Sequence, residues 1–327
     1  MNKNTSSLKT VIIQNNCVVI LIVLIIASAL LSNVFLTWQN ITNLLRQSIP
    51  LLCISMGMLS VILTGGIDLS VGAVMGLGNM MMAFLLDRYL GGSVGGMLLS
   101  ALLTLCVGIA FGFIAGGLTA WGKMAPFIVT LAVMQIARGC AYLVTNGQPI
   151  RLDVKEAGIA PMAAFGNTMI PGINIPWPVL LGLIVVVIFY FVMKYTSFGR
   201  INIAIGSNEK AVQLSGLSVN RYKVMSYVIC GFTSALAGVV ITSRVSTGTP
   251  ITGDGYELDA IAACVIGGAS LSGGQGTVLH TIVGVYVLML ITNILNLLSV
   301  PSYPQQIIKG IVIIVAVLLQ NRAMKSE

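Results

Sequence analysis

The chain has 327 residues, of which 57% are apolar and only 8% are charged. A water-soluble domain of this length would lack the charged side chains needed to cover its surface, so the composition excludes a soluble fold. The net charge of +8 does not indicate a nucleic-acid partner, because the 17 basic residues are scattered and mostly lie at the ends of apolar runs. The sequence therefore predicts an integral membrane protein.

The apolar residues form runs near the length at which a helix crosses the hydrocarbon core. No run alternates apolar and polar residues, so a closed β-barrel is excluded. In chain order the expected spans are residues 17–37, 47–64, 70–86, 98–118, 124–145, 177–193, 224–243, 258–272, 278–298 and 303–320. The spans at 47–64, 70–86 and 258–272 are short or broken by glycine, which predicts half-helices among them. The predicted fold is an all-α, polytopic membrane bundle, forming a single transmembrane domain over residues 1–327.

The basic residues also predict the orientation of the chain. With the N-terminus in the cytoplasm, ten lysines and arginines lie inside and five outside, in agreement with the positive-inside rule. The tails, residues 1–16 and 321–327, are then both cytoplasmic. The two long loops are 146–176 outside and 194–223 inside, and the inner loop carries five basic residues.

Two segments of the chain are similar to one another. Residues 67–78, IDLSVGAVMGLG, match residues 256–267, YELDAIAACVIG, at four of twelve positions, three of them identical and the fourth an Asp aligned with a Glu. They lie five spans apart, and an odd number of spans in each half would give an inverted repeat of five helices. Chance similarity between two helix starts rich in small residues is the alternative explanation.

Glycines and acids interrupt the apolar runs at these same two places. The motif GGIDLSVG contains Asp68 and Ser70, and GYELDA contains Glu257 and Asp259. Irregular backbone is tolerated at membrane depth only where it is packed in protein or lines a cavity, so broken helices indicate a substrate path. Because carboxylates are costly near a membrane, these four residues are candidates for that path.

Arg138 and Lys309 are basic residues inside spans. Arg138 joins the candidate substrate pathway, although either side chain could instead extend to the outer interface and leave its charge in water. Asp68 likewise has an alternative role as a cap of the third span, because Asp is preferred at helix starts.

The sequence indicates neither an enzyme nor a metal protein. The six cysteines and the single histidine, His280, lack catalytic or metal-binding spacing. The glycine-rich stretch GGASLSGGQG contains no lysine and follows no strand, so it is not a phosphate loop and we expect no cofactor on this chain.

The inner loop contains a candidate docking helix in the segment GSNEKAVQLSG. Ser207 can cap a short helix, Glu209 lies favourably in its first turn, and Gly216 can end it. A short exposed helix on a positive loop is typical of a docking element, and a surface turn between two spans is the alternative. The candidate docking residues are Ser207, Asn208, Glu209, Lys210, Ala211, Leu214 and Gly216.

Five segments together resemble the ribose-type sugar permeases of ABC importers, and the resemblance covers nearly the whole chain. They are GGIDLSVG at 65–72, PFIVTLAVMQIARG at 126–139, FGR at 198–200 leading into 206–216, GYELDAIAACVIGGASLSGG at 255–274, and NLLSVPSYPQQIIKG at 296–310. The resemblance implies a permease subunit in the inner membrane of a bacterium. It also implies a second permease subunit, a cytoplasmic ABC ATPase that uses the ATP, and an extracytoplasmic binding protein that delivers a monosaccharide.

The same resemblance implies that residues 206–216 form the coupling segment, which docks on the ATPase. Their spacing departs from the EAA motif of many importer permeases, so the role of the segment is carried over without a contact for each residue. Two other functions fit the residues. One is an ion-coupled secondary transporter with Asp68, Glu257 and Arg138 as coupling residues. The other is an ABC permease for branched-chain amino acids, a related family with glycine-rich helix starts.

Overall fold

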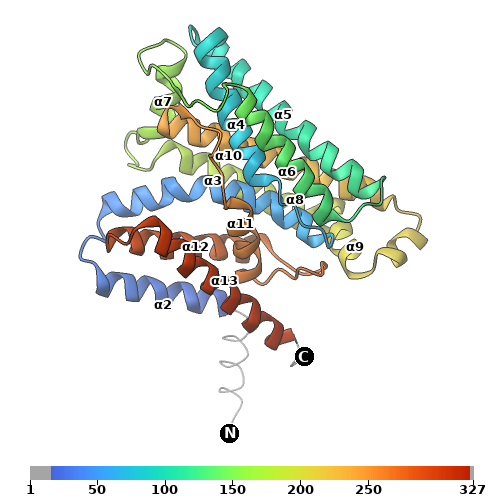
Figure 1. Ribbon diagram of the computed structural model, residues 1–327. Helices are drawn as coiled ribbons and strands as arrows, with labels where there is room; N and C mark the ends of the chain where they lie inside the picture. The colour runs from blue at the N-terminus through green and yellow to red at the C-terminus, as the bar shows by residue number, and fades with distance from the viewer. Residues whose placement is uncertain (1–15, 325–327) are drawn as a thin grey trace.

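The computed structural model describes residues 16–324, and within this range the protein consists of helices, the loops between them and one pair of two-residue strands (Figure 1). The predicted tails 1–16 and 321–327 lie outside the described residues, except for residue 16 and residues 321–324. The helices are α2 (Asn16–Leu31), α3 (Trp38–Leu63), α4 (Val71–Leu85), the π-helical turn η1 (Leu86–Leu90), α5 (Val94–Ala120), α6 (Pro126–Leu143), α7 (Ile159–Asn167), α8 (Trp177–Tyr195), α9 (Ser197–Leu214), α10 (Val219–Val245), α11 (Tyr256–Ile266), α12 (Val278–Leu297) and α13 (Ser302–Met324).

Each of the ten expected spans overlaps one of these helices. Among the described residues, α3, α5, α6, α8, α10 and α12 are long and apolar enough to cross a membrane, which confirms the polytopic helical fold. The expected start of the span at 47–64 is wrong, because α3 begins at Trp38 and has 26 residues. Its helix begins before the apolar run, where the Thr37 hydroxyl caps the Asn40 amide at 3.4 Å.

Two of the expected spans are short helices. Helix α4 has 15 residues and α11 has only 11, so α11 is roughly 16 Å long and covers about half of the hydrocarbon core. The break before α11 depends on Gly253 and Gly255, which both have φ of +81°. Glycine adopts this left-handed conformation without a steric penalty, so the chain can turn here and restart a helix.

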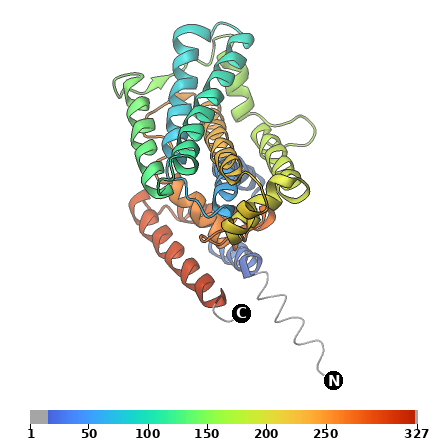
Figure 2. The same cartoon turned by 90° about the vertical axis from the view of Figure 1, so that its right-hand side faces the viewer.

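Each half of the chain contributes one long helix that packs against helices of the other half. Helix α10 packs against α4 and α5, whereas α3 packs against α11 and α12. Figure 1 shows α2, α3 and α12 side by side, and Figure 2 shows α4, α5 and α6 as a second layer. This reciprocal packing is what an internal repeat of the chain would produce.

The crossing of α5 and α10 is close because glycines face it. A Cβ on Gly108 or Gly112 would overlap the backbone of α10, and Gly231 of α10 faces Gly108 in return. Small residues at such positions let helix backbones approach within a membrane, where hydrophobic burial does not drive association. The core of the bundle therefore forms around α10.

The long loop 146–176 is more ordered than the sequence indicated. It contains α7, which packs against α10, and strand β1 (Ile150–Arg151). This strand pairs antiparallel with β2 (Thr247–Gly248), with Ile150 opposite Gly248. The loop is thereby attached to the break between α10 and α11.

Candidate functional site

The break between α10 and α11 is an irregular segment that lies along α4. We call residues 247–255 the α10–α11 linker. Asn79 of α4 is fully buried and makes four hydrogen bonds around it. Its amide donates to Thr242 Oγ1 at 2.8 Å and to the Thr247 carbonyl at 3.0 Å. Its oxygen accepts from the Thr249 amide at 2.8 Å and from Thr252 Oγ1 at 3.0 Å.

Arg138 holds the linker from a second helix. From α6, its guanidinium donates to the carbonyls of Pro250 and Thr252, the latter at 2.9 Å. Carbonyls outside a helix need such partners at membrane depth. Arg138 therefore contacts the irregular backbone of the linker.

Glu257, at the start of α11, lies near the middle of the bundle. Its side chain contacts Gly72 of α4, where an added Cβ would overlap it. The level of Gly72 follows from α10, a helix of 27 residues: the loop before α4 contacts Tyr227, and Gly78 of α4 contacts Ala235. Because these contacts lie on either side of the midpoint of α10, Glu257 is about 20 Å from either end of that helix.

Asp68 and Ser70 bind each other before the start of α4. Both are buried, and Asp68 Oδ1 accepts from the Ser70 amide at 2.9 Å and from its hydroxyl at 2.6 Å. Asp68 therefore fixes the turn that leads into α4. The expected cap by Asp68 is wrong, because the helix begins after Ser70 and, among the described residues, no side chain caps its first amides. The nearby Tyr227 hydroxyl donates to the Ile67 carbonyl.

Asp259 points in another direction. Its carboxylate accepts a hydrogen bond of 2.9 Å from Lys309 of α13. The structure thus brings Arg138 and Glu257 to the linker, whereas Asp259 connects α11 with α13 and Asp68 lies at the base of α4.

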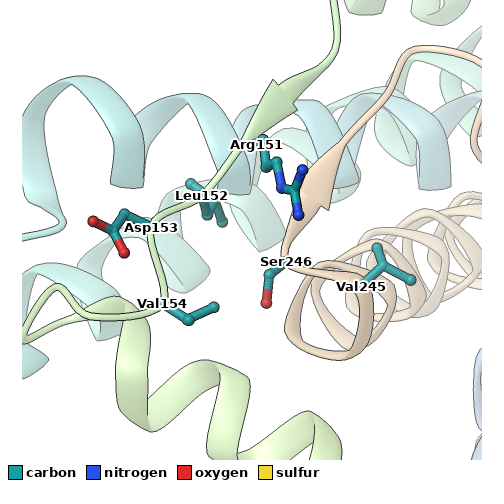
Figure 3. A pocket seen from close by; sticks show the side chains of 6 residues that line it. All are labelled: Arg151, Leu152, Asp153, Val154, Val245 and Ser246. Atoms are coloured by element: carbon teal, nitrogen blue, oxygen red, sulfur yellow. The ribbon is translucent and has the colours of Figure 1, made fainter.

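A cavity of about 450 Å³ opens between the end of α10 and the chain around and after β1 (Figure 3). It is bounded on one side by β1 and the residues after it, and on the other by the end of α10. Ser246, which ends α10 with φ of +50°, accepts a hydrogen bond at its carbonyl from the Leu152 amide. The residues that line the cavity are Arg151, Leu152, Asp153, Val154, Val245 and Ser246.

At the opposite end of α10 lies the predicted coupling segment, residues 206–216. Helix α9 is kinked at Asn208, whose φ of −159° and ψ of 91° are not helical. The Asn208 side chain caps the short helix that follows, accepting from the Ala211 amide at 3.0 Å. Ser207 instead donates to the Ile203 carbonyl, so the cap lies one residue later than expected. Gly216, with φ of +82°, ends the helix as predicted.

The short helix presents one large apolar side chain to its surroundings. Leu214 is 89% exposed, whereas Val212 is buried against Ile205 and Val219. Glu209 pairs with Lys223 of α10 at 2.8 Å, which ties the helix to the bundle. Lys210 and Ala211 are exposed. The segment therefore has a fixed base and a free outer face.

A junction of glycines joins this segment to both broken regions. A Cβ on Gly206 would overlap the Leu63 carbonyl, at the end of α3, and the Gly274 amide, in the turn after α11. That amide also donates to the Leu63 carbonyl at 3.0 Å. Gly273 lies against both Gly206 and Gly65, close enough that a Cβ there would be 2.8 Å from each backbone. We call these four residues and Leu63 the glycine junction.

Sequence reasoning missed Asn79 and the glycine junction. Asn79 is the single amide in the third apolar run, and a lone polar residue in a span is a signal of function that could have marked it. The junction has no such signal, since glycines are abundant in this chain. Among residues 16–324, no group of three or more His, Cys, Asp or Glu side chains could hold a metal ion.

Comparisons with known proteins identify relatives over nearly the full chain. It is 44% identical to the ribose import permease protein of Bacillus subtilis over 304 residues, 92% of this chain and 91% of that protein. It is 40% identical to the ribose import permease protein of Haemophilus influenzae over 310 residues, 95% and 94% of the two chains. It is 31% identical to the L-arabinose transport system permease protein of Escherichia coli over 322 residues, 96% and 92% of the two chains. No solved structure matches the chain.

A family model described as "Branched-chain amino acid transport system / permease component" matches residues 40–317. This range runs from the first turn of α3 into α13 and includes the linker, the coupling segment and the glycine junction. The chain belongs to this family of transport-system permease components.

Proposed function

We propose that this chain is the membrane-spanning permease subunit of an ATP-driven ABC importer for a monosaccharide. The observation that carries the proposal is the coupling segment: an exposed short helix whose stem, at Gly206, packs directly on the ends of both broken regions. A partner that moves this helix would move the ends of α3 and α11 with it. A transporter whose ATPase is a separate chain requires such a mechanical link between the ATPase and the membrane helices.

The substrate class follows from the relatives. Their names specify ribose, L-arabinose and D-allose, all monosaccharides, and the ribose permeases match more than nine-tenths of this chain. The family description names branched-chain amino acids, which makes these the alternative substrate. Uptake of labelled ribose, arabinose, allose and leucine by cells that express the complete system separates the two. Leucine uptake without sugar uptake would contradict the proposal.

The proposed mechanism needs no covalent chemistry on this chain. ATP-driven closure of the ATPase subunits would displace the helix after Asn208, and the glycine junction would pass this displacement to α3 and α11. Because glycine junctions pack backbone against backbone, no flexible side chain absorbs the motion. The sugar would be delivered by an extracytoplasmic binding protein and pass beside a second permease subunit. In this orientation the coupling segment and both termini are cytoplasmic.

Docking of the ATPase is testable through Leu214. Replacing this exposed leucine with glutamine removes about 1.5–3 kcal/mol of apolar burial from the interface, so the ATPase captured with the tagged chain in mild detergent should fall at least about tenfold. Leu36→Gln is a matched control, because Leu36 is 63% exposed in the turn before α3, at the opposite end of that helix. Deleting residues 207–216 should abolish capture, and undiminished capture after deletion would contradict the assignment.

An ion-coupled secondary transporter is the alternative from another class. In that mechanism Asp68, Glu257 and Arg138 would couple the ion to the solute. The bonding of Asp68 to Ser70 and of Arg138 to two carbonyls favours positional roles for both. Uptake in vesicles that lack any ATPase, abolished by collapse of the proton gradient, would establish the secondary transporter instead.

A further inference from the structure

Buried and partly buried side chains hold one side of the α10–α11 linker through hydrogen bonds. An asparagine side chain offers two donors and two acceptor lone pairs, and all four positions of Asn79 are used. Three of the four bonds go to the linker, at Thr247, Thr249 and Thr252. With the two bonds from Arg138, two side chains of the first half of the protein hold the linker against α4 and α6.

The other side of the linker faces outward. Ile251 is 64% exposed and Asp254 is exposed as well. Asp254 follows Gly253, which contacts Gly72 near the middle level of α10. A carboxylate at that depth is not stable against hydrocarbon, and irregular backbone there is tolerated only against protein or water. The exposed side of the linker therefore faces water or a polar protein surface, and not hydrocarbon.

We propose that the α10–α11 linker is a preformed wall of the translocation path, with Ile251 and Asp254 facing the path and Asn79 as the residue that positions the wall. The assignment of sugar as the passing solute rests on the proposed function. The Asp254 carboxylate suits this role because its oxygens accept hydrogen bonds from sugar hydroxyls. Asn79 acts through the linker and contacts no solute itself.

Cysteine accessibility tests the aqueous face directly. Ile251→Cys and the control Leu102→Cys are compared in a background with Cys106→Ser and Cys140→Ser, because Cys106 is exposed and Cys140 partly so. Leu102 is 58% exposed in α5, so both positions start with similar exposure in the protomer. A charged methanethiosulfonate reacts only with hydrated thiols. The cysteine at 251 should react at least about tenfold faster, and equal or slower reaction would overturn the proposal.

This labelling is done on the full chain in membranes without sugar or ATP, so its result does not depend on the proposed function. If the cysteine at 251 is labelled rapidly and no sugar is taken up, the wall assignment stands and the substrate assignment fails. With the complete importer, added substrate sugar should slow the labelling at 251.

The positioning role of Asn79 is tested by two isosteric changes. Thr252→Val removes one bond between Asn79 and the linker, whereas Thr242→Val removes one bond between Asn79 and α10. Thr242→Val also removes the bond that its hydroxyl donates to the Gly238 carbonyl at 2.9 Å, so its melting temperature should fall at least as far as that of Thr252→Val. Only Thr252→Val should lower the maximal uptake rate several-fold, and Thr252→Ser should restore it. Equal loss of uptake in both variants would show that Asn79 only stabilises the fold.

Discussion

Lys309 of α13 and Asp259 of α11 form an ion pair of 2.9 Å, with their side chains only 24% and 16% exposed. Each is a charged residue within an apolar span, where an unpaired charge would be costly. The half-helix α11 is thereby attached near its start to the last helix of the chain. This pair explains why a carboxylate and a lysine occur where the sequence suggested a path or an interface.

Removing one member of this pair should destabilise the protein. Asp259→Asn or Lys309→Gln leaves an unpaired, mostly buried charge, and we expect a loss of about 1–3 kcal/mol, below the range for fully buried pairs because some water reaches both groups. The double variant should lose less than the sum of the two single variants. Thermal unfolding in detergent measures the cycle, and strictly additive losses would mean that the charges do not interact.

The crossing of α5 and α10 predicts a second, purely steric effect. Gly112→Ala places a methyl group against the backbone of Tyr227 and Val228, which should cost about 1–3 kcal/mol through overpacking. Gly117→Ala, in the same helix, meets only the edge of Trp121 at 3.4 Å and should be neutral or slightly stabilising. The melting temperatures of the two purified variants check the difference, and similar values would contradict the close approach.

Much of the fold is predictable because a span needs only length and apolarity. All ten apolar runs fall on helices, and the glycine-broken run at 258–272 is a half-helix as expected. The length of α3 was missed because polar residues are mixed into its first turns, and a cap at Thr37 extends the helix beyond the apolar run. A hydropathy pattern does not reveal local hydrogen bonds of this kind.

The site was predictable only in part. The motifs around Glu257 and residues 206–216 were recognisable, since charge and glycine interrupt apolar sequence there. Their partners were not, because the bonds to Asn79 join positions more than 160 residues apart. The glycine junction depends on the absence of Cβ atoms at four places that meet only in the folded protein. Such contacts come from tertiary packing and have no pattern along the chain.

Coupling through the glycine junction can be tested at Gly206. Gly206→Ala inserts a methyl group between α9, the end of α3 and the turn after α11, so this contact must open. We expect the ATPase to remain bound through the coupling segment while sugar uptake per ATP hydrolysed falls several-fold. Gly139→Ala is the control, because a Cβ there meets nothing within 4 Å. Unchanged stoichiometry of uptake to hydrolysis in Gly206→Ala would remove the junction from the mechanism.

The position of the cap in the coupling segment gives a final prediction. Asn208→Ala deletes the bond to the Ala211 amide and should cost the short helix about 1 kcal/mol. Asn208→Asp keeps an acceptor at the same place and should retain function. Ser207→Ala removes only a bond back to the Ile203 carbonyl, so ATPase capture should stay near that of the unaltered chain. The short helix has few residues, so the loss of its capping bond removes a large part of its stability. Asn208→Ala should therefore weaken ATPase capture about fivefold or more. If Ser207→Ala and Asn208→Ala weakened capture equally, the helix would not begin at Asn208 when the ATPase is bound.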